Sequence, residues 1–218
     1  MIELYHCNDA RSFRALWALE ELGLDYRLHM LPFPPRAYAK EFLGENILGT
    51  VPYLIDGAER MTESSAIPHY LATRYGPSPL AVAPEEPGYG AYLNGLFHGE
   101  ATLTFPQTLV LRYRFFEPEE RRLPQAAEDY AQWFLGRLRF IDSILETSDY
   151  AAAGRFTMAD ISIGYALKLA FFTKLSGELP ERVLAYWRRL ECRDGYQRAM
   201  AAQAREQELQ LGKKSGDF

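Results

Sequence analysis

The sequence is poor in cysteine, with only Cys7 and Cys192 among its 218 residues. Two cysteines so far apart make a disulfide framework and a cysteine zinc site equally improbable. We therefore expect no bound metal, and a reducing cytoplasm is the expected location.

Long apolar runs are absent, and none approaches the roughly 18–20 residues that span a bilayer. The first residues, MIELYHCND, carry an acid at position 3 and no basic segment. That start is unlike a secretory signal peptide. An excess of positive charge is also absent, because the formal net charge is −5 and both signs are spread along the chain. We therefore expect neither nucleic acid nor a membrane as a partner.

Hydrophobic residues make up 48% of the chain, which is enough to fill one large core or two small ones. Their spacing along the chain follows two different patterns. Residues 1–76 alternate short apolar runs with helical spacing in the order β-α-β-α-β-β-α, which predicts an α/β domain with a small mixed sheet. Residues 77–88 contain four prolines and are predicted to be a linker. Residues 89–218 carry mostly helical spacing, which predicts an all-α bundle.

Two strand-to-helix junctions carry candidate chemistry. In YHCNDARSFR, Cys7 and Ser12 lie near a helix N-terminus, which favours a bound anion or thiolate. In TESSAI, Glu63 could hold an ammonium group, and Ser64 could hold the carboxylate beside it, as in the head of an α-amino acid. In both segments helix capping is the alternative explanation, and Cys7 could simply be a small buried side chain.

The third candidate segment is LGTVPYL, where Pro52 interrupts a short apolar run. Proline lacks the backbone N–H that a strand interior needs. A cis bond at Pro52 would leave the backbone of Val51 facing outward, where an extended peptide could pair with it. A proline that merely blocks edge-to-edge association is the other explanation. In FTMADIS, Thr157 and Asp160 have the spacing of a capping box, which is a fold signal.

In this order and spacing, the segments LYHCNDARSFRALWALEELGLDY, EFLGENILGTVPYL, ESSAI and FTMADIS resemble those of the cytosolic glutathione transferases, as in a bacterial member of unassigned class. The resemblance covers nearly the whole chain. It implies a thioredoxin-like glutathione-binding domain at 1–76, a linker at 77–88 and a helical domain at 89–218. It also implies a homodimer, glutathione as co-substrate and a small apolar electrophile as second substrate.

The resemblance further implies roles for individual residues. Val51 before a cis Pro52 would pair with the cysteinyl part of glutathione, and Glu63 with Ser64 would hold its γ-glutamyl head. The lysine that often meets the glycine carboxylate is replaced by Tyr38, so Arg36 or Lys40 could substitute. The electrophile pocket is predicted on one helical face, with ordinary bundle core as the alternative: Phe105, Leu109, Tyr113 and Phe116.

The residue that activates the glutathione thiol stays open at this point. Tyr5 matches the tyrosine of the alpha, mu and pi classes, whereas Ala10 and Arg11 stand where the theta-class serine and beta-class cysteine occur. With Ser12 or a nearby backbone N–H as donor, the protein would conjugate glutathione to an electrophile. With an exposed Cys7 of low pKa, it would instead be a thiol–disulfide enzyme similar to the omega class. A non-catalytic binding protein on the same fold is the third hypothesis.

Overall fold

The computed structural model describes residues 1–212 and divides the chain into two compact units. The first unit consists of Met1–Ser78 and the segment that starts at Cys192, and the second consists of Pro79–Glu191. The sequence analysis assigned the C-terminal helix to the helical domain. By its contacts the structure groups this helix with the N-terminal residues, and the division at 1–76, 77–88 and 89–218 stays a prediction.

The first unit contains a four-stranded sheet in the order β2-β1-β3-β4. Its strands are β1 (Ile2–His6), β2 (Tyr26–Met30), β3 (Tyr53–Asp56) and β4 (Glu59–Met61). Strand β1 pairs parallel with β2 and antiparallel with β3, and β3 forms a hairpin with β4 across Gly57. This is the predicted thioredoxin-like sheet.

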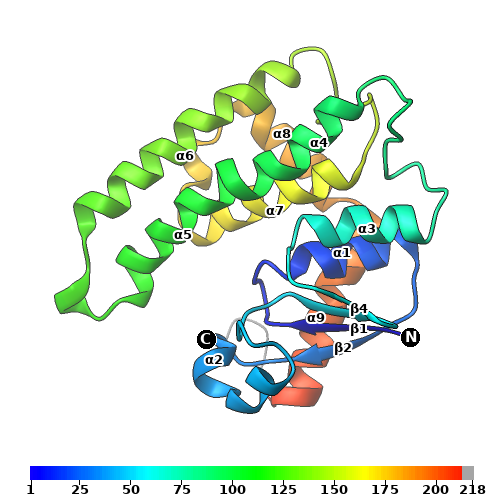
Figure 1. The fold of residues 1–218 in the computed structure, drawn as a ribbon. Coiled ribbons are helices and arrows are strands. Elements are labelled where there is room, and N and C mark those ends of the chain that lie inside the picture. The colour runs from blue at the N-terminus through cyan, green and yellow to red at the C-terminus, as the bar shows by residue number, and fades with distance from the viewer. Residues whose placement is uncertain (213–218) are drawn as a thin grey trace. The chain divides into compact units, whose positions relative to one another are not determined.

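Helices cover both faces of this sheet, as Figure 1 shows. Helices α1 (Phe13–Leu22) and α3 (Ala66–Arg74) lie on one face, and the short helix α2 (Pro35–Tyr38) with the 3-10 turn η1 (Lys40–Gly44) belongs to the other. Strand β1 alternates accordingly: its even-numbered residues are buried, while Tyr5 packs on the opposite face against Phe42 and Tyr53.

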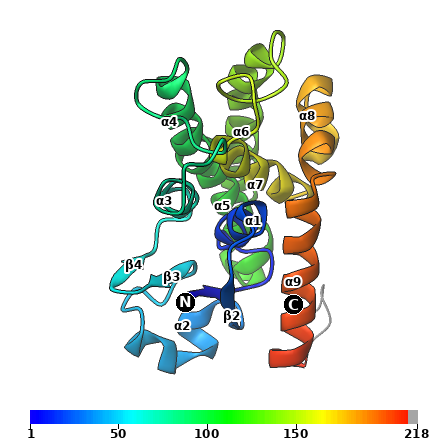
Figure 2. The same ribbon diagram turned by 90° about the vertical axis from the view of Figure 1, so that its right-hand side faces the viewer.

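Helix α9 (Asp194–Leu211) runs beside α1 and β2, as Figure 2 shows. The ring of Tyr196 lies 5.1 Å from that of Trp17, and Arg193 forms an ion pair with Glu21 at 2.7 Å. Near the end of α9, the side-chain amide of Gln210 accepts a hydrogen bond from the Met30 N–H and donates one to the Leu28 carbonyl. Because β2 is an outer strand, this amide covers its open edge.

The second unit is helical, and its described residues add only one isolated β-bridge, between Ala152 and Arg155. Its α-helices are α4 (Tyr89–Phe97), α5 (Phe105–Leu111), α6 (Pro124–Ile144), α7 (Met158–Phe172) and α8 (Glu181–Glu191). The π-helical turns η2 (His98–Thr104) and η3 (Arg112–Phe116) flank α5, and 3-10 turns lie at Glu119–Arg121 and Ser176–Glu178.

Helix α7 is the centre of the second unit, because it is buried on nearly every side. It starts with the predicted capping box, in which Thr157 accepts from the Ala159 N–H and Asp160 accepts from the Thr157 N–H. Gly99 on η2 contacts this helix so closely that an added Cβ would lie 2.4 Å from the Ser162 backbone. The predicted linker is partly held to this unit, since the Met158 N–H donates to the Leu80 carbonyl.

Within residues 1–212, no helix is both long enough and apolar enough to cross a membrane. The same residues contain no group of three His, Cys, Asp or Glu side chains placed to hold a metal ion.

Candidate functional site

The β1–α1 junction is built around a buried hydrogen-bond chain. Ser12 stands at the N-cap position of α1, yet its side chain makes no capping bond. Instead its Oγ lies 2.7 Å from Nδ1 of His6, and the Nε2 of His6 lies 3.0 Å from Oε1 of Gln203 on α9. All three side chains are fully buried.

The direction of these hydrogen bonds follows from Gln203. Its Oε1 also accepts the Asp9 N–H at 3.2 Å, and its Nε2 donates to Asp9 Oδ1 at 2.8 Å, which fixes the orientation of the amide. An amide oxygen only accepts, so neutral His6 carries its proton on Nε2 and presents a lone pair at Nδ1. When the ring is neutral, the Ser12 hydroxyl donates to Nδ1 of His6, and in either state its oxygen accepts the Cys7 N–H at 3.4 Å. In the neutral state the Ser12 proton is therefore held by His6.

Cys7 does not have the properties that the thiol–disulfide hypothesis requires. Its side chain is fully buried, and its Sγ lies 3.7 Å from the Pro32 carbonyl. Burial raises the pKa of the Cys7 thiol to about 12. The thiol–disulfide hypothesis assumed that the Cys7 thiol is exposed and has a low pKa. The structure contradicts this assumption, because a thiolate at Cys7 would have to form out of contact with solvent.

Thiol labelling tests this assignment directly. At pH 8, an excess of an aromatic disulfide reagent is expected to modify one thiol per chain, that of exposed Cys192. Buried Cys7 is expected to react only after the chain is unfolded, because its raised pKa leaves a negligible thiolate fraction at this pH. The Cys192→Ser variant is the control and should show no rapid labelling. Rapid modification of Cys7 in that variant would contradict the burial seen here.

Tyr5, the third candidate for thiol activation, packs into an aromatic cluster. Its ring stacks on His29 at 4.5 Å and lies 5.1 Å from Phe42. Burial raises the pKa of Tyr5, and the negative charges of Glu45 and Glu3 raise it further. Tyr5 is thus a neutral hydroxyl at physiological pH.

Val51 has the backbone arrangement that the sequence analysis expected. The Val51–Pro52 peptide bond is cis, and the β1–β3 pairing ends at Tyr53. Among the described residues, neither the N–H nor the C=O of Val51 takes a hydrogen bond. Asn46 holds the preceding turn, since its side chain donates to the Thr50 carbonyl and accepts the Leu48 N–H. Both backbone groups of Val51 are therefore open to a hydrogen-bonding partner.

Glu63 and Ser64 lie at the N-terminal end of α3 and differ in their surroundings. Within residues 1–212, the exposed carboxylate of Glu63 has no ion pair or hydrogen bond. Ser64 is buried, and its hydroxyl accepts a hydrogen bond of 3.0 Å from Arg14, whose guanidinium is fully buried. A free carboxylate thus stands beside a rigid helix N-terminus, where an ammonium and a carboxylate group could both be bound.

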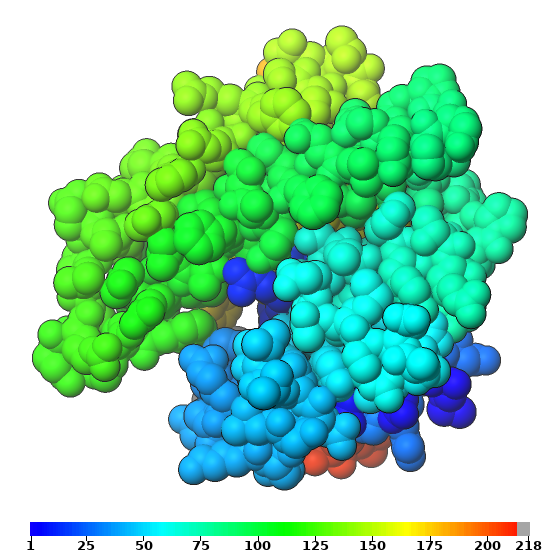
Figure 3. Space-filling model, in the orientation of Figure 1, coloured from blue at the N-terminus to red at the C-terminus, as the bar shows by residue number. Residues whose placement is uncertain are grey.

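Tyr38 and Lys40, at the α2–η1 boundary, are exposed, as is Arg36 one turn earlier. Their side chains belong to the light-blue segment at the surface in Figure 3. Several large apolar side chains of the same segment are also exposed: Phe33, Leu43, Ile47 and Leu48. Exposure leaves Tyr38 and Lys40 open to a ligand carboxylate, but the geometry does not favour one of them.

The four predicted pocket residues do not belong to the core of the second unit. Phe105 is 51% exposed and Phe116 is 52% exposed, while Leu109 and Tyr113 are partly exposed. The buried face of helix α5 is formed by three other residues: Pro106, Gln107 and Val110. A cavity of about 440 Å³ includes Tyr113 alone of the four, together with polar side chains such as Arg114 and Glu128.

Two of the residues that organise the site were missed by the sequence analysis. His6 reads as an ordinary strand residue, and Gln203 lies 197 positions away on a helix predicted for the other domain. Arg14 was also given no role, although it is a buried cation on a mostly apolar helix. An arginine among the apolar residues of a helix is unusual, and this is the one signal in the sequence that could have identified Arg14.

Comparisons with known proteins agree with this geometry. The family model "Glutathione S-transferase, N-terminal domain" matches residues 1–73. Glutathione S-transferase 3 of Zea mays is 27% identical over 202 residues, which cover 87% of this chain and 88% of the maize protein. Residues 1–73 thus match the glutathione S-transferase family model, and the chain is similar to a glutathione S-transferase over most of its length.

Solved glutathione transferase structures are similar to this chain over both units. A theta-class glutathione S-transferase of Xanthomonas axonopodis pv. citri with glutathione bound has a TM-score of 0.77 at 26% identity, covering 91% of this chain and 96% of that one. A glutathione transferase of Phanerochaete chrysosporium in complex with oxidised glutathione has a TM-score of 0.81 at 25% identity, covering 94% and 96%. The first of these structures holds glutathione and the second holds its disulfide, oxidised glutathione.

Proposed function

We propose that this protein is a glutathione S-transferase, an enzyme that conjugates glutathione to a small apolar electrophile. The observation that carries the proposal is the unpaired backbone of Val51. A tripeptide in extended form needs such a donor and acceptor pair at its centre. The free carboxylate of Glu63 would bind the α-ammonium group of glutathione, and Ser64 would bind the adjacent carboxylate.

The chemical step needs a thiolate. Glutathione's thiol loses its proton to water, and its sulfur then forms a C–S bond with the electrophile, which expels a leaving group or takes up a proton. Because Ser12 Oγ is buried against His6 and the first residues of α1 are fully buried, we assign stabilisation of the thiolate to backbone N–H groups of the loop between Cys7 and Ser12. These groups and the helix dipole favour a negative charge without any titratable side chain.

The second substrate is proposed to bind on the exposed face of α5 and η3. Phe105, Leu109, Tyr113 and Phe116 offer apolar and aromatic surface there, which suits a small hydrophobic electrophile. Either Tyr38 or Lys40 would meet the glycine carboxylate of glutathione. The homodimer and the cytoplasmic location stay predictions, although exposed Ile47 and Leu48 provide apolar surface for a second copy.

Calorimetry and a conjugation assay together test the proposal. Glutathione is expected to bind with a Kd below about 1 mM. Cysteinylglycine, which lacks the γ-glutamyl head, should bind at least about tenfold more weakly because it cannot reach Glu63. The Cys7→Ala variant is expected to conjugate 1-chloro-2,4-dinitrobenzene at the wild-type rate.

Each alternative has its own outcome in these assays. No binding at millimolar glutathione would contradict both enzymatic hypotheses. Binding without conjugation of any electrophile tried would favour the non-catalytic binding protein. A mixed disulfide with glutathione that disappears in Cys7→Ala would favour the thiol–disulfide enzyme, against the burial of that side chain.

A further inference from the structure

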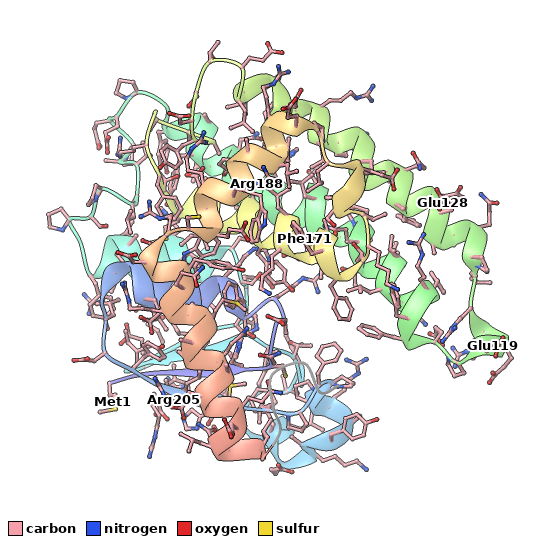
Figure 4. All side chains as sticks on the ribbon, turned by 180° about the vertical axis from the view of Figure 1, so that it is seen from behind. Met1, Glu119, Glu128, Phe171, Arg188 and Arg205 are labelled. Atoms are coloured by element: carbon pink, nitrogen blue, oxygen red, sulfur yellow. The ribbon has the colours of Figure 1, made fainter. Side chains whose placement is uncertain are left out.

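Helix α9 reaches into the candidate site through one buried side chain. Gln203 is fully buried, and its amide makes a two-point contact with Asp9, accepting from the backbone N–H at 3.2 Å and donating to Oδ1 at 2.8 Å. The outer face of the same helix is solvated, as the exposed side chain of Arg205 shows in Figure 4. A fully buried glutamine on such a helix needs partners for every polar atom, and Asp9 supplies two of them.

The residue that Gln203 contacts has an unusual backbone conformation. Asp9 has a φ of +54°, in the left-handed region that L-residues other than glycine rarely adopt. Such a conformation persists only where surrounding contacts hold it. The paired hydrogen bonds from Gln203 are contacts of this kind, and they act on the loop between Cys7 and Ser12.

Gln203 also acts on the other end of this loop. Its Oε1 accepts from Nε2 of His6 at 3.0 Å, which fixes the tautomer of His6 and turns the Ser12 hydroxyl toward Nδ1. The Ser12 oxygen in turn accepts the Cys7 N–H. One amide therefore ties down the loop at Asp9 and, through His6, at Ser12 and Cys7.

We propose that Gln203 is a positioning residue for thiol activation, a role that rests on the proposed function. Its amide holds residues 7–12 in the backbone conformation in which N–H groups of this loop, whose residues 8–11 are partly exposed, meet the glutathione thiolate. Gln203 itself touches neither substrate. Its loss should raise the pKa of bound glutathione without removing the contacts at Val51 and Glu63 that hold the tripeptide.

The Gln203→Leu variant tests this role, since leucine has a similar size and no hydrogen-bonding group. The thiolate absorbance of bound glutathione near 240 nm is expected to titrate about one pH unit higher than in the wild type. The kcat/KM for conjugation at pH 6.5 (roughly the pH at which thiolate supply limits the rate) should fall about tenfold. The Kd of glutathione should stay within about threefold, because its binding contacts are unchanged.

Gln210→Leu is the matched control, because Gln210 lies on the same helix and also binds backbone groups of the first unit. It is expected to leave the thiolate titration unchanged. Ser12→Ala combined with Gln203→Leu should lose less than the product of the two single losses, because both act through His6. If Gln203→Leu does not fold, Gln203→Met, which is unbranched like glutamine and also lacks the amide, is expected to show the same upward shift.

Two results would overturn the proposal: an unchanged thiolate titration in Gln203→Leu, or an equal shift in Gln210→Leu. A wild-type protein that does not bind glutathione would instead contradict the proposed function. In that case ¹⁵N NMR of His6 still tests the contact. The wild type is expected to show the Nε2–H tautomer alone and Gln203→Leu a mixture, whereas an identical tautomer in both proteins would refute the role of Gln203.

Discussion

Replacing Asp160 by alanine is expected to lower the free energy of unfolding of the helical unit by about 3–4 kcal/mol. The Asp160 carboxylate is fully buried and accepts from four donors: the Ala151 N–H at 2.8 Å, the Thr157 N–H at 2.7 Å, the Thr157 hydroxyl at 3.2 Å and the Tyr186 hydroxyl at 2.6 Å. Alanine would leave these donors in a dry environment without an acceptor.

Urea unfolding followed by fluorescence measures this loss, since Trp133 and Trp187 belong to the helical unit and Trp17 to the other. Asp142→Ala is the control in the same unit. Asp142 pairs at 2.7 Å with Arg182, which is half exposed, so its loss should cost at most about 1 kcal/mol. Equal losses for the two variants would contradict a special role of the Asp160 hydrogen bonds.

The success of the sequence analysis at Asp160 shows which features can be read from local spacing. Thr157 and Asp160 are three positions apart, and a capping box needs no partner outside that stretch. The strand and helix order of residues 1–76 was predictable for the same reason, because apolar periodicity reflects a buried face. The turn at Gly57 is equally local, since its φ of +60° favours glycine.

Features that join distant segments were not predictable. The periodicity of α9 shows that one face of this helix is buried but not which unit buries it, so its packing against α1 and β2 was missed. The hydrogen-bond partner of Ser12 could not be predicted for a related reason. Whether a hydroxyl donates to a ligand or to the protein depends on its partner, and the orientation of that partner, His6, is set by Gln203.

The candidate glutathione site could be predicted from local sequence only in part. Val51, Pro52, Glu63 and Ser64 were found because each lies in a short segment whose composition has a physical consequence. Their roles in binding a ligand stay predictions. Within the described residues, the backbone groups of Val51 and the carboxylate of Glu63 make no hydrogen bond or ion pair that would show what they bind. A test of the site must therefore measure binding rather than stability.

Replacing Glu63 by alanine is expected to weaken glutathione binding about 30-fold, or about 2 kcal/mol. The Glu63 carboxylate is exposed and unpaired within the described residues, so its removal should leave the fold intact. In the complex it would face the ammonium group of glutathione, and a charge-assisted hydrogen bond of this kind is stronger than a neutral one. Calorimetric titration of both proteins with glutathione measures the difference.

The kinetic consequence separates binding from chemistry. Because Glu63 would contact the γ-glutamyl head and not the sulfur, the KM for glutathione should rise while kcat at saturating glutathione stays within about twofold. Glu59→Ala is the control, since Glu59 is an exposed acid on β4 four positions earlier. A fall in kcat with unchanged Kd would contradict the assignment, because it would place Glu63 at the reacting atoms and the γ-glutamyl head elsewhere.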